Sequence, residues 1–189
     1  MRKLIYMIGM PGTGKTTVIK KLMEQVPFVR DEAPIQLLET HSSTTDPKIR
    51  LLGVYEDDQV YSGTDRLSMA VAPQAIKYLE RKNDEIILGE GDRLNNKGFF
   101  RAALDNEFEL HIIVLETSDA ERQRRYDERG SNQKESFLKT VNTKVNNMVE
   151  AFGPQNTLFG QEPGYVTKVQ HSTPDQTQTV VDLIMSLRD

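Results

Sequence analysis

Short apolar runs alternate with longer amphipathic stretches along the chain. The apolar runs predict β-strands at residues 4–8, 35–40, 85–89, 110–115 and 165–170. A polar turn is predicted after the second strand, at residues 41–45, and a hairpin or ordered excursion at residues 49–54 and 60–61. Because such an excursion commonly carries the acceptor substrate of a transferase, we assign about residues 41–72 to an acceptor-binding insertion.

Apolar residues three and four positions apart predict helices between these strands. Strands that alternate with helices favour right-handed crossovers onto one sheet. We therefore predict an α/β fold with a mostly parallel, five-stranded sheet flanked by helices. The first predicted helix follows residue 16 and ends at Pro27, and the next two span residues 73–81 and 97–107. A fourth helix begins at a capping box at 118–121, a fifth spans 134–151, and a sixth begins at a cap at 173–176.

One motif lies at the junction of the first strand and the first helix. Residues 9–16 match G-x-x-x-x-G-K-[ST] at every fixed position, which predicts a phosphate-binding loop and a P-loop NTPase fold. The glycines let successive backbone N–H groups face a phosphate, and the helix N-terminus adds partial positive charge. Lys15 is expected to reach the β- and γ-phosphates of ATP, Thr16 to bind Mg²⁺, and Thr17 to approach the α-phosphate. The residues of this segment assigned to ATP are Gly9, Pro11, Gly12, Thr13, Gly14, Lys15, Thr16 and Thr17.

Length and composition narrow the class of protein. A chain of 189 residues is expected to form a single domain over residues 1–189. It has no cysteine, which excludes disulfides and a thiolate nucleophile, and no apolar run approaches the roughly 20 residues of a membrane span. The N-terminal apolar run leads into the phosphate loop and not into a cleavage site, so we expect a cytoplasmic protein without membrane partners. A formal net charge of −4 argues against broad attraction to nucleic acid.

Charged residues follow the strand at residues 85–89, in the order Glu90-Gly91-Asp92-Arg93. Ligands of open α/β sheets bind beyond the carboxyl ends of the strands, and charges buried there are costly without a charged partner. Asp92 is assigned to catalysis and, through water, to Mg²⁺; Arg93 is assigned to the acceptor or the moving phosphoryl group. Glu90 is assigned to acceptor binding, and the division of roles between the two acids stays open.

Two further strand ends carry residues that could bind the acceptor substrate or remove its proton. In residues 63–68, Asp65 is a candidate general base, Arg66 a candidate clamp on an anionic substrate, and Thr64 a candidate acceptor contact. The alternative is that these side chains only cap a helix entry, and spacing alone does not decide between the two. Glu39 could also supply a base or bind the acceptor, although a solvated turn is the favoured interpretation.

The segment after the strand at 110–115 is rich in arginine. Between residues 122 and 144 there are seven basic residues against three acids, on either side of a Gly-Ser turn. Small P-loop kinases place a lid here whose arginines close on the transferred phosphoryl group, so we assign about residues 119–145 to a lid. Arg125 and Arg129 are assigned to catalysis and Arg122 to ATP. Charged residues on a helix often form only a solvent-exposed face, and the pattern does not show which of the arginines contact phosphate.

The motifs distinguish among nucleotide-binding classes. A GTPase would carry Asn-Lys-x-Asp, but the only Asn-Lys pair, at Asn96-Lys97, lacks the acid. Sensor elements of motor ATPases are absent from the sequence, and the charged strand ends argue against a protein that uses ATP only as a switch. Phosphoryl transfer from ATP to a hydroxyl group fits best.

Several motifs together resemble a narrower family. They are the phosphate loop and residues 52–55, 63–69, 90–94, 129–133, 137–139 and 143–144. This combination resembles phage-encoded P-loop kinases that include the 5-hydroxymethyluridine DNA kinases of phages with hypermodified thymidine. The resemblance covers residues 4 to about 148.

The resemblance implies ATP-dependent phosphorylation of the 5-hydroxymethyl group of a modified uracil in DNA, in the host cytoplasm. Asp65 or Asp92 would then take the proton of the primary hydroxyl late in the transfer. The implied partners are ATP, Mg²⁺ and DNA with a modified pyrimidine. The acidic net charge keeps open a deoxynucleoside monophosphate kinase, in which the same arginines would bind a single phosphate.

Overall fold

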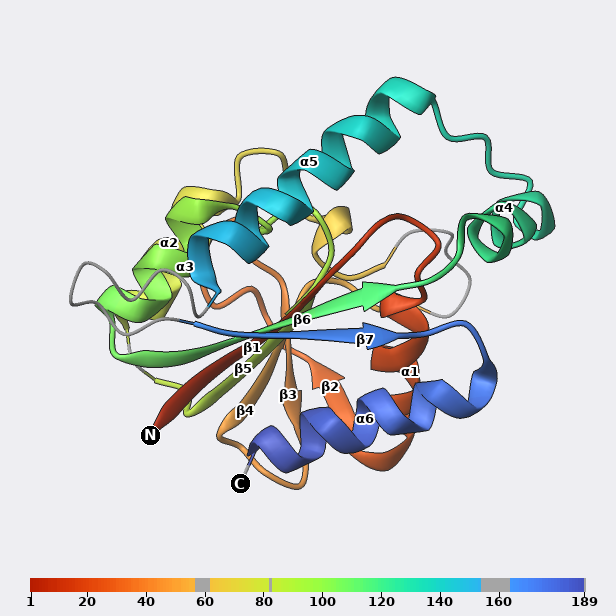
Figure 1. The fold of residues 1–189 in the computed structure, drawn as a ribbon. Coiled ribbons are helices and arrows are strands. Elements are labelled where there is room, and N and C mark those ends of the chain that lie inside the picture. Colours follow the sequence, from red (N-terminus) through yellow and green to blue (C-terminus); the bar gives the residue numbers. More distant parts are fainter. Residues whose placement is uncertain (57–61, 82, 154–163, 189) are drawn as a thin grey trace.

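The protein folds around one seven-stranded sheet, seen edge-on in the computed structural model of Figure 1. The structure describes residues 1–56, 62–81, 83–153 and 164–188. The strand order is β2-β3-β4-β5-β1-β6-β7, in which β4, β5, β1, β6 and β7 are parallel and β2 and β3 add antiparallel pairs at one edge. The strands are β1 (Arg2–Ile8), β2 (Phe28–Arg30), β3 (Thr40–Ser43), β4 (Ile49–Leu52), β5 (Ile86–Glu90), β6 (Phe108–Glu116) and β7 (Tyr165–Gln170).

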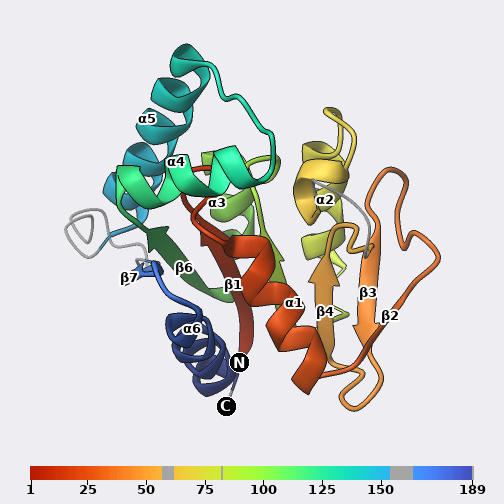
Figure 2. The same cartoon turned by 90° about the vertical axis from the view of Figure 1, so that its right-hand side faces the viewer.

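Helices cover both faces of this sheet, as Figures 1 and 2 show from two directions. One core joins the sheet to α2, α3 and α5, and the other joins it to α1 and α6. Alternate residues of β1 supply the two cores: Tyr6 packs into the first and Met7 into the second. The helices are α1 (Lys15–Gln25), α2 (Ala72–Glu80), α3 (Lys97–Asp105), α4 (Asp119–Glu128), α5 (Glu135–Phe152) and α6 (Pro174–Arg188), with a short 3₁₀ helix η1 (Thr64–Arg66).

Most of the predicted elements are confirmed. The strands expected at 4–8, 85–89, 110–115 and 165–170 are β1, β5, β6 and β7, and the predicted helices match α1 to α6. Ser118 is the N-cap of α4, because its hydroxyl accepts a hydrogen bond from the Glu121 backbone N–H at 3.2 Å, while the Glu121 carboxylate pairs with Arg124 and Arg125 in place of the return bond of a capping box. Among the helices of the described residues, none combines the length and apolar composition that crossing a membrane requires.

The prediction at residues 35–40 is wrong. Instead of a strand, this segment contains a tight turn closed by a hydrogen bond from Leu38 N to Ile35 O, with Leu37 at a left-handed φ of 68°. The apolar signal was real but came from local packing, since Leu38 is fully buried and Ile35 packs against the same core.

The strand β3 lies where a polar turn was predicted. The hydrophobic pattern does not reveal this strand, because its hydroxyl groups are buried with charged partners. Thr40 donates to Asp31 at 2.8 Å, and Arg50 of β4 pairs with Asp31 at 2.6 Å. The five parallel strands are therefore extended to seven by β2 and β3, neither of which carries an apolar run.

The predicted hairpin at 49–54 and 60–61 is only partly described. Residues 49–52 form β4, a parallel partner of β5, so they belong to the central sheet. Val54 and Gly63 form an antiparallel bridge, which brings the two ends of the intervening segment together. Residues 57–61, including the predicted strand at 60–61, lie outside the described residues.

Candidate active site

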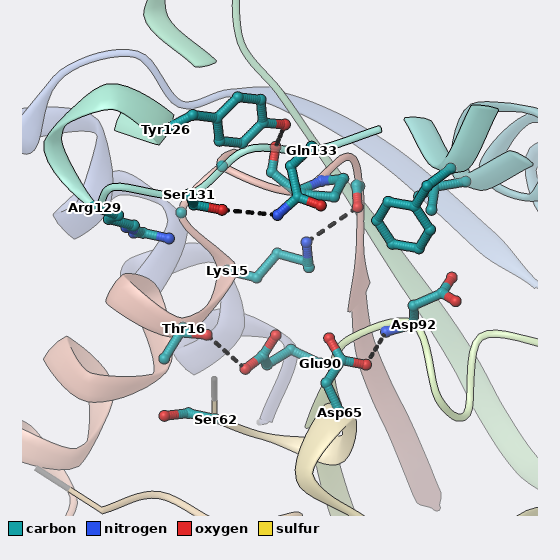
Figure 3. Close-up of a pocket in the computed structure, with 16 residues that line it drawn as sticks. Lys15, Thr16, Ser62, Asp65, Glu90, Asp92, Tyr126, Arg129, Ser131 and Gln133 are labelled. Carbon is teal, nitrogen blue, oxygen red and sulfur yellow. Dashed lines mark hydrogen bonds between the residues drawn. The ribbon is translucent and has the colours of Figure 1, made fainter. Parts of the chain in front are cut away.

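A cavity of about 190 Å³ lies at the carboxyl edge of the sheet, beside the loop that follows β1 (Figure 3). It is walled by the phosphate loop, the end of β5, the entry to η1, and the segment from α4 into α5. Its lining residues are Gly9, Pro11, Gly12, Gly14, Lys15, Thr16, Ser62, Asp65, Glu90, Asp92, Tyr126, Arg129, Ser131, Gln133, Phe137 and Val141.

The phosphate loop is fixed from behind by the β7–α6 connection. Gly14, the N-cap of α1, has a φ of 91°, and a Cβ there would lie 2.3 Å from the His171 ring. His171 Nδ1 donates to Thr13 O at 2.6 Å, and Thr177 donates to His171 Nε2 at 2.8 Å. Burial lowers the pKa of His171, so the ring is neutral at pH 7. Only glycine fits at residue 14, and the loop backbone is held ready for an anion at the start of α1.

Lys15 faces the cavity from the first turn of α1. Its Nζ donates to Gly9 O at 3.0 Å (Figure 3) and to Met10 O at 3.2 Å. The cation therefore lies across the mouth of a loop whose glycines leave room for phosphate oxygens. The loop and Lys15 together fit the phosphates of a nucleotide.

Glu90 lies beside Thr16 and is almost completely buried, with 1% of its surface exposed. The Thr16 hydroxyl donates to Glu90 Oε1 at 3.0 Å (Figure 3). Burial raises the pKa of Glu90 to about 7; Lys15 and the Thr16 hydrogen bond oppose the shift, whereas Asp65 adds to it. A carboxylate next to the loop hydroxyl provides the oxygen ligands that Mg²⁺ prefers.

Asp92 does not share this position. Its Oδ2 is paired with Lys144 Nζ of α5 at 2.9 Å, and Lys144 also donates to Asp92 O at 2.8 Å. The acid in contact with Thr16 is thus Glu90, while Asp92, assigned to Mg²⁺ through water, lines the same cavity and is paired with Lys144. In the described part of the chain, no three His, Asp or Glu side chains gather as a ready-made metal cage.

Asp65 lines the cavity and also orders the loop after β5. Its Oδ1 accepts hydrogen bonds from the backbone N–H groups of Asp92 at 2.7 Å and Arg93 at 3.0 Å. The two interpretations of Asp65 are therefore compatible, because a carboxylate oriented by the backbone still faces the cavity.

Two other predicted residues are engaged inside the protein. The Thr64 hydroxyl donates to Glu90 O at 2.8 Å and lies 2.8 Å from the Tyr6 hydroxyl. Arg93 donates to Asp65 O at 3.2 Å and contacts the Met69 sulfur. Neither side chain lines the cavity around Lys15.

Glu39 and Arg66 lie outside the cavity lining as well. Glu39 forms an ion pair with Arg30 of β2, which also reaches Glu56 at 3.0 Å. Arg66 lies 3.9 Å from Glu56, at the edge of the same charged group. Their predicted contacts with the acceptor would require an acceptor that extends beyond the cavity.

The three arginines that the sequence assigned to a lid and to ATP occupy three different places. Arg129 is exposed and lines the cavity, and its side chain has no ion pair among the described residues. Arg125 donates to Gly12 O at 2.8 Å and His171 O at 3.2 Å, so it lies against the outer side of the phosphate loop. Arg122 pairs with Asp119 and lines a second hollow, of about 620 Å³, between α5 and the opposite side of the phosphate loop.

Tyr126 adds a further contact between α4 and the phosphate loop. Its hydroxyl donates to Pro11 O at 2.6 Å, and a Cβ on Gly12 would lie 2.9 Å from its ring. Together with Arg125, this residue joins the arginine-rich helix directly to the nucleotide-binding loop.

Sequence reasoning missed several lining residues. Ser62 carried no pattern that selected it, and Ser131, Gln133 and Phe137 lay in the motifs at residues 129–133 and 137–139 without a role of their own. The Ser62 hydroxyl is buried and has no hydrogen-bond partner among the described residues. The apolar residues on one side of α5 continue to Phe137, one turn past the end of the core, and this extension could have marked Phe137 as a candidate.

The family model described as P-loop Nucleotide Kinase3 matches residues 1–186. None of the curated proteins matches the sequence.

Several solved structures resemble this chain at low sequence identity. An unliganded sugar kinase from Janibacter sp. HTCC2649 superposes with a TM-score of 0.50 at 12% identity, covering 98% of this chain and 94% of its own. Kti12 from Chaetomium thermophilum, in complex with ADP-AlF3, gives 0.48 at 12% identity, with 97% and 98% covered. A gluconokinase from Sinorhizobium meliloti 1021 gives 0.45 at 14% identity, with 99% of each chain covered. The likeness to the sugar kinase, together with the family match, shows a P-loop kinase fold.

Proposed function

The chain belongs to the P-loop Nucleotide Kinase3 family, and we propose that it transfers the γ-phosphoryl group of ATP to a hydroxyl group of an acceptor. The observation that carries this proposal is the cavity in which Lys15, the Thr16–Glu90 pair and Arg129 meet. A binding switch would need the loop and the metal ligands, but not the apolar side chains and the arginine, without an ion pair among the described residues, that line the rest of the same cavity.

Each part of the nucleotide has a natural place in this arrangement. The backbone N–H groups at the start of α1 and the Lys15 ammonium would hold the β- and γ-phosphates. The Thr16 hydroxyl and Glu90 would hold Mg²⁺, which supplies charge neutralisation of the phosphates when bound. The base and ribose would then extend past Gly14 towards Arg125 and the loop at His171, with Arg129 on the phosphoryl side.

In the proposed transfer, the acceptor oxygen attacks the γ-phosphorus while the bond from that phosphorus to the β,γ-bridging oxygen breaks and ADP leaves. Lys15 and Arg129 stabilise the charge on the transferred group. Asp65 takes the hydroxyl proton, because two backbone N–H groups orient it, whereas the carboxylate of Asp92 is already paired with Lys144.

For the acceptor, we propose the 5-hydroxymethyl group of 5-hydroxymethyluracil in phage DNA. The motif resemblance at residues 63–69, 90–94 and 129–133 supports this substrate. The net charge of −4 favours the second candidate, a free deoxynucleoside monophosphate.

Salt dependence should separate the two acceptors. The protein is incubated with Mg-ATP and either duplex DNA containing 5-hydroxymethyluracil or a panel of free deoxynucleosides and monophosphates, and the products are digested and weighed. With DNA as acceptor, we expect phosphate on the base of the polymer alone and a steep fall of kcat/KM between 50 and 200 mM salt, because each neutralised DNA phosphate contributes a slope of about −0.9. Phosphate on a free nucleotide alone, with a shallow salt dependence, would assign the protein to nucleotide metabolism.

Arg125 and its neighbour Arg124 provide a matched pair of substitutions on α4. Arg125→Ala removes the contacts to Gly12 O and His171 O, so we expect KM for ATP to rise roughly tenfold. Arg124→Ala removes only exposed pairs with Glu121 and Glu128, so KM should stay within about twofold. Steady-state kinetics with ATP varied measures both, and equal effects of the two substitutions would show that α4 acts only through its net charge.

A further inference from the structure

The apolar stripe of α5 continues beyond the hydrophobic core. Val145, Met148 and Phe152 are buried against the sheet and α3, and Val141 is buried at the start of the same stripe. One turn earlier, Phe137 is 44% exposed, and both Phe137 and Val141 line the cavity that holds Lys15. An aromatic side chain therefore stands at the phosphoryl-transfer cavity without being needed by the core.

Phe137 shares its cavity with uncharged side chains that can hydrogen-bond the polar edge of a small ring. Gln133 Nε2 donates to Ser131 Oγ at 2.9 Å, which orients the Gln133 amide, and its carbonyl oxygen has no partner among the described residues. The buried Ser62 hydroxyl offers another hydrogen bond in the same cavity. A flat ring needs an apolar surface and few polar groups of this kind.

The size of the cavity points the same way. Pockets for drug-sized ligands occupy roughly 300–1,000 Å³. The cavity here measures about 190 Å³, which suits a single monocyclic group beside the transferred phosphoryl.

We propose that Phe137 is the stacking platform for the acceptor, which is a planar pyrimidine ring whose polar edge is bound by Gln133. This inference rests on the proposed kinase function and adds the residue that selects the acceptor. Stacking on Phe137 places the ring beside Asp65 and Lys15, which line the same cavity, so that a hydroxymethyl substituent faces the phosphoryl group.

The first test uses binding alone. The chain has no tryptophan, so Phe137→Trp introduces a single indole fluorophore at the platform. We expect saturable quenching of its emission by 5-hydroxymethyl-2′-deoxyuridine monophosphate and by thymidine monophosphate, and none by ribose 5-phosphate. Quenching by ribose 5-phosphate equal to that by the nucleotides, or no quenching at all, would overturn the platform.

The second test uses kinetics with the accepted substrate varied. Phe137→Ala should raise KM for the acceptor on the order of tenfold to a hundredfold, Phe137→Tyr should restore most of it, and KM for ATP should stay unchanged. Thr140→Ala is the control, since Thr140 is exposed on the same helix and lies outside the cavity lining. An unchanged acceptor KM in Phe137→Ala, or an equal rise in KM for ATP, would refute the platform while leaving the kinase function standing. If no acceptor is phosphorylated at all, the kinase function fails, and the fluorescence titration still decides whether Phe137 binds a pyrimidine.

Discussion

Lys15→Ala is expected to lower kcat/KM for phosphoryl transfer on the order of a thousandfold. Among the described residues, Lys15 is the one lysine that lines the cavity, and its ammonium lies at the mouth of the phosphate loop. Its loss removes a charge from the place where negative charge gathers in the transition state. Stability should change by about 1 kcal/mol or less, because within the described part of the chain the side chain makes two hydrogen bonds, both to loop carbonyls.

Lys21→Ala is the matched control for this experiment. Lys21 lies on the same helix but pairs with Glu24 at the surface. Its removal should leave kcat/KM within about twofold of the unsubstituted protein. Thermal unfolding of both variants verifies that they are folded. Full turnover by folded Lys15→Ala would contradict the assignment of the phosphate loop to the chemistry.

Glu90→Gln is expected to stabilise the protein at pH 8 while abolishing metal-dependent activity. The pKa of Glu90 is raised from 4.5 to about 7 by burial. Between these two values the folded protein keeps a proton that the unfolded chain has released, so the free energy of unfolding falls as pH rises from about 4.5 to about 7. A pKa shift of this size corresponds to about 3 kcal/mol in the free energy of unfolding, and all of this stability is lost above pH 7. Glutamine keeps the shape without the charge and removes this loss.

Chemical denaturation at pH 5 and pH 8 measures the effect. We expect similar stabilities at pH 5 and a gain of up to about 3 kcal/mol for Glu90→Gln at pH 8. Glu85→Gln is the control, because Glu85 directly precedes β5 and forms an exposed pair with Lys48. Parallel pH profiles for Glu90→Gln and the unsubstituted protein would show that Glu90 carries no raised pKa.

The sequence predicted the elements whose stability comes from apolar burial. Continuous runs such as residues 86–88 and 112–115 are buried on both faces of the sheet, so their pattern alone identified β5 and β6. The failures have two causes: the apolar residues at 35–40 pack locally in a turn, and β3 is polar. β3 is held by hydrogen bonds of Thr40 and Ser42 to Asp31, and a hydrophobic pattern cannot register such bonds.

In the candidate site, too, local features could be predicted from the sequence and contacts between distant residues could not. The phosphate loop is a local feature, and its geometry follows from adjacent glycines and the start of one helix. The partner of Thr16 depends on the pairing of β1 with β5, in which Met7 lies opposite Glu90. The pair of Lys144 with Asp92 joins residues 52 positions apart. No spacing rule links such residues before the sheet and α5 are assembled, so the roles of Glu90 and Asp92 could not be separated from the sequence.

Phosphorus NMR of a reaction mixture tests the proposed chemistry most directly. The protein, Mg-ATP and the 5-hydroxymethyluracil duplex are incubated, and ADP, inorganic phosphate and any new phosphomonoester are quantified, with Lys15→Ala and Lys21→Ala in parallel. We predict ADP and a phosphomonoester in equal amounts for the unsubstituted protein and Lys21→Ala, and neither for Lys15→Ala. ADP with inorganic phosphate alone, for every acceptor offered, would contradict phosphoryl transfer to a hydroxyl group and would identify an ATP-hydrolysing switch.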